Sequence, residues 1–358
     1  MDEVEKSCSF TESRAAGLRR ERVLASPRFI EGRFRNTKRV APGIKGNPLP
    51  VLGEYFFGTE GRTPPAPPPL VSPLPHWAAP PETGLRATWL GHSTVLLELD
   101  GVTVLTDPVF GERASPLSFA GPKRFHAPPV SIAELPRLDA VLVSHDHYDH
   151  LCRSSIKELV LRDVPFVTSL GVGSRLEAWG VRPERITELD WWDEHVLPGG
   201  RLSFTAAPAQ HFSGRTLRDR NSTLWSSWCL KTARHRVFFS GDTGLTDEFV
   251  EIGRRLGPFD LVMLEIGAYH PSWGDIHLGP ENALTAHAYL GSGTLLPVHW
   301  GTFNLALHAW DEPAETLFQR AAEKGVRVLT PKLGSPIEPE RIEVPTAWWR
   351  TVGRATTG

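Results

Sequence analysis

The chain has 358 residues, 40% of them hydrophobic, and a formal net charge of −2 at pH 7. This length allows one large α/β domain or two smaller ones, and the composition and charge argue against a disordered chain and a general nucleic-acid-binding protein. No run reaches the roughly 18 apolar residues of a membrane-spanning helix. The first twenty residues lack the apolar core of a secretory signal, and Cys8, Cys152 and Cys229 are scattered. We therefore expect a cytoplasmic protein in a reducing compartment.

The N-terminal part is first basic and then rich in proline. Residues 14–45 carry ten Lys or Arg against two Glu, a local charge of +8 that leaves −10 for the remainder. This asymmetry is typical of an arm that binds anionic surfaces such as phospholipid head groups, although a solvated arm lying over the domain fits equally well. Residues 64–81 contain nine prolines, which excludes a helix or central strand and favours an extended linker. We therefore predict an N-terminal extension at 1–84 and the main domain at 85–358.

Apolar runs alternate with turn signals through the main domain. Strands are predicted at 87–90, 94–99, 102–105, 138–143, 166–168, 202–206, 223–232, 237–239, 261–265 and 294–298. Asp100-Gly101 indicates a hairpin turn between the second and third of these. Helices are predicted after His150 through Val160, and at 246–256, 280–290 and 312–324, with Pro280 in a first turn and Gly291 at a C-terminal cap.

The segment 144–150, Ser-His-Asp-His-Tyr-Asp-His, is unusually dense in potential metal ligands. It follows the predicted strand 138–143. His145 and His147 are two residues apart, so an extended backbone points both imidazoles the same way, while Asp149 and His150 approach from where the chain leaves the strand. Four candidate ligands within six residues exceed what one tetrahedral site takes when it also collects ligands from elsewhere. This density favours a two-metal site over a solvated turn.

Three further candidate ligands each follow a predicted strand: His211 after 202–206, Asp242 after 237–239 and His299 after 294–298. A sheet can hold side chains from distant parts of the chain at one edge. Singly, these residues fit a surface loop, a turn and a core histidine. Together with the segment 144–150, they predict a metal site at the strand ends. Cys152 is explained more simply as a small buried apolar residue.

The order of these residues resembles that of the metallo-β-lactamase-fold hydrolases. The pattern is His145-x-His147-x-Asp149-His150, followed by His211, Asp242 and His299. The resemblance covers roughly residues 87–333 and implies an α/β (α+β) fold, an αββα sandwich of two mixed sheets packed face to face with helices outside. The segments 89–92, 105–108, 144–150, 208–211, 266–269 and 298–303 resemble, more narrowly, the branch of N-acylphosphatidylethanolamine-hydrolysing phospholipases D.

The resemblance also implies which residues bind the metals. His145, His147 and His211 would hold one ion, Asp149, His150 and His299 the second, and Asp242 would bridge both. Imidazole and carboxylate ligands without a thiolate suit zinc, so we expect two Zn²⁺ ions, with Mn²⁺ or Fe as alternatives.

Further residues are expected to act beside the metals. Asp149 and Asp242 are candidate catalytic residues, the first for handling the proton of the attacking water and the second for setting the metal spacing. His277 is expected to bind substrate or protonate the leaving group, although an exposed histidine before a helix is the simpler alternative. His92 and Asp107 are expected to orient ligands, and Tyr148, Tyr269 and His270 to lie near the substrate cleft, or, for Tyr148, to pack beneath it.

These expectations combine into one functional hypothesis. Two metals about 3.5–4 Å apart can share a hydroxide at neutral pH, which would attack phosphorus in a phosphodiester of the N-acylphosphatidylethanolamine type. The alternatives are a lactonase or β-lactamase-like hydrolase and a non-catalytic metal-binding protein. We expect a small-molecule or phospholipid phosphodiester substrate, no nucleic acid, and a peripheral contact with anionic membranes as an open option.

Overall fold

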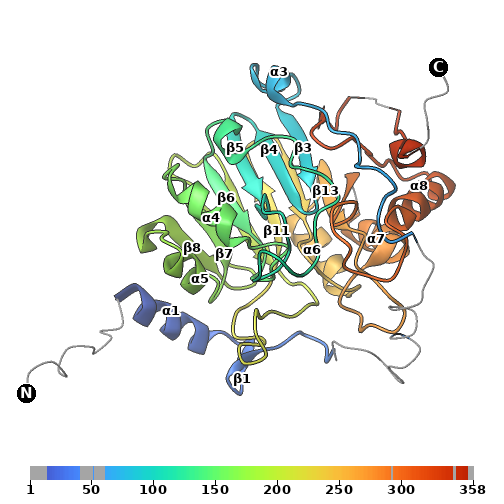
Figure 1. Ribbon diagram of the computed structural model, residues 1–358. Helices are drawn as coiled ribbons and strands as arrows, with labels where there is room; N and C mark the ends of the chain where they lie inside the picture. The colour runs from blue at the N-terminus through green and yellow to red at the C-terminus, as the bar shows by residue number, and fades with distance from the viewer. Residues whose placement is uncertain (1–13, 41–50, 52–60, 292, 342–343, 354–358) are drawn as a thin grey trace, which may run out of the picture.

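The computed structural model describes residues 14–40, 51, 61–291, 293–341 and 344–353. Two large β-sheets lie face to face in the described part of the chain, and helices flank them on the outside (Figure 1). The predicted αββα sandwich is therefore confirmed. In the same described residues, no helix combines the length and the apolar character needed to cross a membrane.

The first sheet has the strand order β15-β3-β4-β5-β6-β7-β8. Its strands are β3 (Leu85–Gly91), β4 (Thr94–Leu99), β5 (Val102–Thr106), β6 (Ala140–Val143), β7 (Phe166–Ser169), β8 (Ile186–Leu189) and β15 (Pro336–Ile337). β3, β4 and β5 form the predicted antiparallel meander, and β5 through β8 run parallel. Asp100 and Gly101 both have positive φ, 48° and 80°, as a tight hairpin turn requires.

The second sheet has the order β14-β13-β12-β11-β10-β9. Its strands are β9 (Glu194–Val196), β10 (Ser203–Ala207), β11 (Ser227–Lys231), β12 (Arg236–Phe239), β13 (Leu261–Glu265) and β14 (Thr294–Val298). β12, β13 and β14 are parallel, whereas β9, β10, β11 and β12 alternate in direction. The predicted strand 223–232 is shorter in the structure because only Ser227–Lys231 pairs with β10 and only residues 228–231 pair with β12. β8, β9 and β15 were not predicted; each is only two to four residues long.

Alternation of side chains in the first sheet separates two apolar layers. In β4, Val95, Leu97 and Leu99 belong to the core between the sheets, whereas Leu96 belongs to the layer under the outer helices. β6 repeats the pattern, with Leu142 pointing between the sheets and Val141 to the other side. Successive strand residues point to opposite faces, so a strand buried on both faces is continuously apolar, as these runs are.

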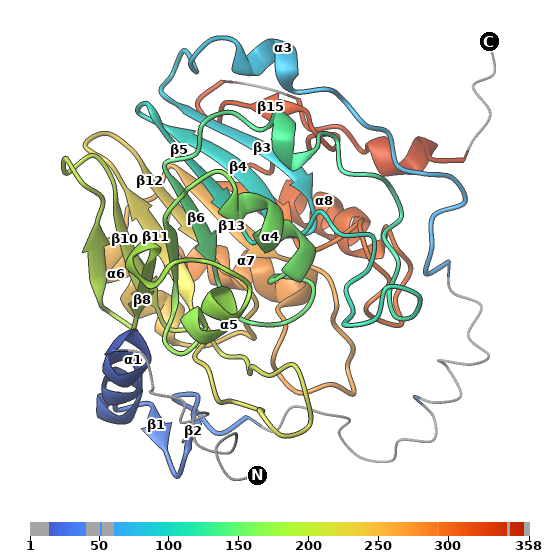
Figure 2. The same cartoon turned by 60° about the vertical axis from the view of Figure 1, so that its left-hand side comes forward.

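Helices close the sandwich on both sides. The side of the first sheet is covered by α4 (Arg153–Val160) and α5 (Gly173–Ala178), together with the 3₁₀ turns η1 (Ile132–Glu134) and η2 (Pro183–Arg185). The side of the second sheet is covered by α6 (Glu248–Leu256), α7 (Gly279–Leu290) and α8 (Glu312–Lys324) (Figures 1 and 2). The predicted cap of α7 is confirmed because Gly291 has φ 86° and its N–H donates to His287 O. A last 3₁₀ turn, η3 (Trp348–Thr351), packs two tryptophans into the core.

The described N-terminal residues lie against the domain. α1 (Arg14–Ala25) is followed by a hairpin of β1 (Phe29–Ile30) and β2 (Arg33–Phe34) near β8 and α5 (Figure 2). Arg19 forms an ion pair of 2.5 Å with Glu177 in α5 and another with Glu188 in β8. Several cations of the arm are therefore paired with the domain, which supports the second of the two alternatives for this segment.

The proline-rich segment contains one turn of helix, α3 (Leu74–Trp77). The prediction that residues 64–81 contain no helix is wrong for these four residues. Pro75 lies in the first turn of α3, where the missing N–H has no intrahelical partner to lose. Residues 41–45 of the basic segment lie outside the described residues.

Candidate metal centre

The candidate ligands lie on loops at one end of the sandwich. His92 follows β3, the segment 144–150 follows β6, and His211 follows β10. Asp242 and His299 follow the parallel strands β12 and β14. Each of these strands points its C-terminal end to the same edge, which is why residues more than 200 positions apart come together there.

The first ligand set consists of His145, His147, His211 and Asp242, whose ligand atoms all lie within 4.8 Å of one another. His147 Nδ1 is 2.9 Å from His145 Nε2 and 3.3 Å from His211 Nε2. Asp242 Oδ2 is 3.8 Å from His145 Nε2 and 3.6 Å from His211 Nε2. Three imidazoles and one carboxylate are thus arranged around one point, as in a tetrahedral site.

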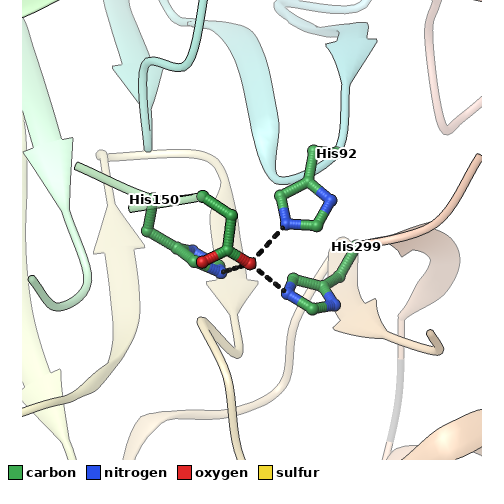
Figure 3. A group of neighbouring side chains, drawn as sticks. His92, His150 and His299 are labelled. Carbon is green, nitrogen blue, oxygen red and sulfur yellow. Dashed lines mark hydrogen bonds and ion pairs between the residues drawn. The ribbon is translucent and has the colours of Figure 1, made fainter. Parts of the chain in front are cut away.

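The second set consists of His92, Asp149, His150 and His299. Figure 3 shows its three labelled imidazoles around one carboxylate oxygen, which is Asp149 Oδ2, 3.0 Å from His92 Nε2 and 3.2 Å from His299 Nε2. The same oxygen is 3.5 Å from His150 Nε2. His92 was expected only to orient ligands, yet its Nε2 lies as close to this carboxylate as the predicted ligands do.

Asp242 lies between the two sets. While Oδ2 faces the first set, Oδ1 is 3.0 Å from His150 Nε2 and 3.2 Å from His299 Nε2 in the second. The side chain is 3% exposed. One carboxylate with an oxygen toward each set has the placement that a bridging ligand requires.

Hydrogen bonds orient three imidazoles toward the sets. His150 Nδ1 is 2.6 Å from Asp107 Oδ2, and His211 Nδ1 is 2.8 Å from Ile276 O. Ser144 Oγ donates to Asp107 Oδ2, so it accepts from His145 Nδ1 at 2.9 Å. Each Nδ1 is thus occupied by a hydrogen bond, so Nε2 is the nitrogen of each ring that is directed toward its ligand set. Outer-shell acceptors orient metal-binding histidines in this way, and Asp107 has the orienting placement expected of it.

Two buried polar atoms support a fit to metal ions. His150 Nε2 and Asp242 Oδ1 are inaccessible to solvent and have no hydrogen-bond partner among the described residues. Leaving buried polar atoms unpaired is costly. An imidazole nitrogen and a carboxylate oxygen that face one another without a hydrogen bond can both coordinate a divalent cation. The residues present are therefore suited to the metals that the sequence predicts.

Electrostatics differ between the two sets. Burial lowers the pKa of His145 and of His211 well below the ordinary value, with neighbouring histidines adding to the effect, so both imidazoles are neutral. Burial also acts to lower the pKa of His299, but the nearby carboxylates of Asp242 and Asp149 outweigh it and raise the pKa to about 10. The same balance holds for His150. The second set is therefore rich in negative charge, which favours a cation.

A buried glutamate that the sequence analysis missed lies beside both sets. Glu265 ends β13 and its Oε2 is 2.7 Å from His277 Nδ1 and 3.8 Å from His299 Nδ1. Its Oε1 accepts from Thr243 N at 2.7 Å. The available signal was an acidic residue at the end of a continuously apolar strand. Glu265 pairs with His277, and His277 lines the cavity wall. The alternative of an exposed histidine before a helix therefore does not describe His277.

Backbone strain marks three residues of the site. His92, Asp107 and His299 have positive φ values of 51°, 33° and 63°. Non-glycine residues in this region are uncommon and typically cluster at functional sites. All three are buried, so the surrounding packing holds them in this conformation.

A cavity of about 570 Å³ opens over the candidate ligands. Its wall combines apolar side chains with one cation, Arg220; the apolar members include Phe212, Leu217, Trp273, Ile276 and Leu305. Deep in it lie His147, Asp149, His211, Asp242, His277 and His299. The cavity therefore gives a ligand access to both sets past a mostly apolar wall.

The structure does not bring the three other predicted cleft residues to the metals. The Tyr148 hydroxyl donates to Arg215 O at 2.9 Å, and Arg215 covers its ring. Tyr269 donates to Glu312 and stacks on His308. His270 Nδ1 accepts from Ser272 N, whereas Trp273, further along the same loop, lines the cavity. None of the three is among the residues that line this cavity.

The fold and the two ligand sets together define a metal-dependent hydrolase. A sequence profile described as the beta-lactamase superfamily domain matches residues 102–300. The chain belongs to this superfamily.

Named relatives add detail. An uncharacterized protein of Mycobacterium tuberculosis is 48% identical over 84% of this chain and 80% of its own length. The N-acyl-phosphatidylethanolamine-hydrolyzing phospholipase D 1 of Caenorhabditis elegans is 42% identical over 62% of this chain and 65% of its own length. A solved isothiocyanate hydrolase from Delia radicum gut bacteria has a TM-score of 0.58 at 22% identity, covering 71% of this chain and 98% of that chain, and shares the fold.

Proposed function

We propose that the protein is a two-metal phosphodiesterase of the phospholipase D type that hydrolyses amphiphilic phosphodiesters such as N-acylphosphatidylethanolamines. The observation that carries this proposal is the placement of Asp242 between two ligand sets at the base of a mostly apolar cavity. The similarity to the phospholipase D of Caenorhabditis elegans supports the substrate class.

In this proposal the ligands divide as the resemblance implies. His145, His147 and His211 would hold one ion and Asp149, His150 and His299 the other, with His92 beside the second set, and Asp242 would contact both. Zinc is the preferred ion, with manganese or iron as alternatives. When bound, the two ions supply Lewis-acid stabilisation of the phosphoryl oxygens and lower the pKa of water.

The chain's own groups position the reactants and move protons. Asp149 presents one carboxylate oxygen to the second set, and its other oxygen is available for the proton of the attacking water. His277 faces the cavity, and Glu265 holds the proton on its Nδ1 at 2.7 Å. Burial acts to lower the pKa of His277, but the charge of Glu265 outweighs it and raises the pKa. A protonated His277 is suited to donate to the departing alkoxide.

The cavity wall suits a substrate with apolar chains and one anionic group. Phe212, Trp273 and Ile276 offer apolar surface beside the ligands, and removing such surface from water contributes about 25 cal/mol per Å². The Arg220 side chain, whose Cζ lies 5.5 Å from the centroid of the Phe212 ring, is the cation of the wall. A phosphodiester carrying acyl chains satisfies both features.

Exposed apolar side chains favour a peripheral membrane contact for the same protein. Leu217, at the cavity wall, is fully exposed, and Phe119 in the loop after β5 is 78% exposed. Leu117 on the same loop lines a neighbouring pocket with Tyr148 and Arg215. Apolar side chains interspersed with arginines are suited to the boundary of an anionic bilayer.

A substrate panel tests the proposed reaction. A chromogenic phosphodiester, an N-acylphosphatidylethanolamine, a lactone and a β-lactam are compared on zinc-loaded and manganese-loaded protein, with His277→Ala as a matched variant. We expect turnover of both phosphodiesters, faster with the lipid because its chains supply remote binding energy. In ¹⁸O-labelled water, the label should enter the phosphate product. Label in the alcohol product, or turnover confined to the lactone or β-lactam, would replace this proposal with the alternative hydrolase.

A further inference from the structure

We infer that Asn36, in the N-terminal arm, is a positioning residue for the candidate metal ligand His211. The inference rests on the ligand assignment proposed above and goes beyond it, because no residue before the main domain was expected to take part in the site. The arm thereby belongs to the metal centre.

The contact is a two-point clamp on one backbone unit. Asn36 Nδ2 donates to His211 O at 2.7 Å, and His211 N donates to Asn36 Oδ1 at 3.0 Å. A third bond reaches the same amide, because Trp225 Nε1 donates to Asn36 Oδ1 at 3.1 Å. One side-chain amide therefore satisfies both the N–H and the C=O of the residue that carries the imidazole.

The arm is itself anchored at this point. Phe34, two residues earlier, is fully buried in a cluster with Leu170, Trp191, Ala209, Leu224 and Trp225. Its backbone N donates to Asn221 O at 2.8 Å, and Asn221 Nδ2 donates back to Phe34 O at 3.2 Å. Burial of a phenylalanine side chain is strongly favourable, so the packing of Phe34 fixes where Asn36 lies.

His211 depends on this clamp because its loop has no strand partner of its own. β10 ends at Ala207, and the next strand begins at Ser227. His211 is 1% exposed, so its backbone groups cannot turn to water if Asn36 is shortened. On the ring side, the hydrogen bond of Nδ1 among the described residues goes to Ile276 O, at 2.8 Å. A backbone shift would therefore carry Nε2 away from the first ligand set.

The clamp acts on one set and not on the other. The described contacts of Asn36 reach His211 and Trp225. In the second set, by contrast, a hydrogen bond to Asp107 orients His150, and the loop after β14 carries His299. A loss of Asn36 should therefore weaken one of two metal ions. A role in general stability would show no such selectivity.

The experiment measures stepwise metal affinity by competition with a chromogenic zinc chelator in the full chain. Asn36→Ala removes all three bonds. Asn36→Asp preserves the volume and both accepted bonds but places an oxygen against His211 O. Arg35→Ala is the matched control, since the side chain of the neighbouring residue pairs with Glu31 inside the arm. Cobalt-substituted protein reports the geometry of the weakened site by its visible spectrum.

We expect one ion to bind about ten- to hundredfold more weakly in Asn36→Ala, the range typical of lost outer-shell partners, with the second ion and the Arg35→Ala protein unchanged. Asn36→Asp should shift in the same direction, and it decides the matter if Asn36→Ala does not fold. Wild-type affinity for both ions in the variants, or equal weakening of both ions, would overturn the inference. Wild-type protein that binds no second ion would instead overturn the proposed function.

Discussion

Glu265 Oε2 lies 2.7 Å from His277 Nδ1, at the point where β13 ends beside both ligand sets. Because Glu265 Oε1 already accepts from Thr243 N, only Oε2 is free to hold the imidazole. The Glu265–His277 pair therefore fixes a proton on Nδ1 of His277 and leaves Nε2 as the nitrogen that faces the cavity.

Glu265→Gln should lower kcat by about ten- to hundredfold while leaving metal content unchanged. The amide oxygen would keep the bond from Thr243, so the NH₂ group would face His277 Nδ1 and force the opposite tautomer. Elemental analysis and steady-state kinetics check both parts. Combined with His277→Ala, the effect should be strongly non-additive; additive losses would place Glu265 outside the function of His277.

Purified protein should hold close to two transition-metal ions per chain. His150→Ala and His299→Ala each remove a predicted ligand of the second set, so each should retain about one ion. His211→Ala provides the comparison in the first set. A wild-type content of one ion that neither second-set variant changes would contradict a binuclear centre.

Asp242→Ala should impair activity more than any single histidine change. Its two oxygens face different ligand sets at 3.0 Å and 3.6 Å, so its loss disturbs both ions at once. We expect kcat/KM to fall by well over tenfold, or more than about 1.4 kcal/mol of transition-state stabilisation. Activity within tenfold of wild type at saturating zinc would rule out a bridging role.

His126, which is not one of the candidate ligands, should make the stability of the protein depend on pH. Burial, assisted by the charge of Arg124, lowers the pKa of His126 to about 4, against about 6.5 in the unfolded chain. The unfolded state therefore takes up the proton first, and stability present above pH 6.5 is lost as the pH falls to 4, by roughly 3 kcal/mol. Urea unfolding of wild type and His126→Gln across this range checks the difference. Parallel pH curves would contradict it.

Binding to anionic vesicles should depend on exposed apolar side chains of the cavity wall and of the loop after β5. Phe119→Ser and Leu217→Ser remove apolar groups that are 78% and fully exposed, so both should weaken vesicle sedimentation. Val250→Ser, an exposed change on α6, is the control. Added salt should reduce the binding of wild type, because screening weakens contacts with anionic lipid. Equal sedimentation of all four proteins would exclude a membrane contact through these side chains.

The fold class could be predicted from the sequence through the resemblance that its ligand motifs carry, and most strands and candidate ligands could be predicted from local patterns. Apolar runs such as Leu261–Glu265 and Thr294–Val298 coincide with β13 and β14, since a strand buried on both faces must be continuously apolar. The density of histidine and aspartate in 144–150 predicted a metal site in this segment, because the spacing of ligands along one strand end is a local property of the sequence. The loop positions of His211, Asp242 and His299 followed from the strands before them.

Contacts between distant segments could not be predicted from local sequence patterns. Glu265 and Asn36 carry no local signal of their roles, because their partners His277 and His211 are brought to them by β13 and by the burial of Phe34. The same reason explains where Tyr148 and Tyr269 point: Tyr148 packs against Arg215 and Tyr269 donates to Glu312, and both partners lie far along the chain. Residue types and spacing show which atoms are available as ligands, whereas long-range packing determines where each atom points.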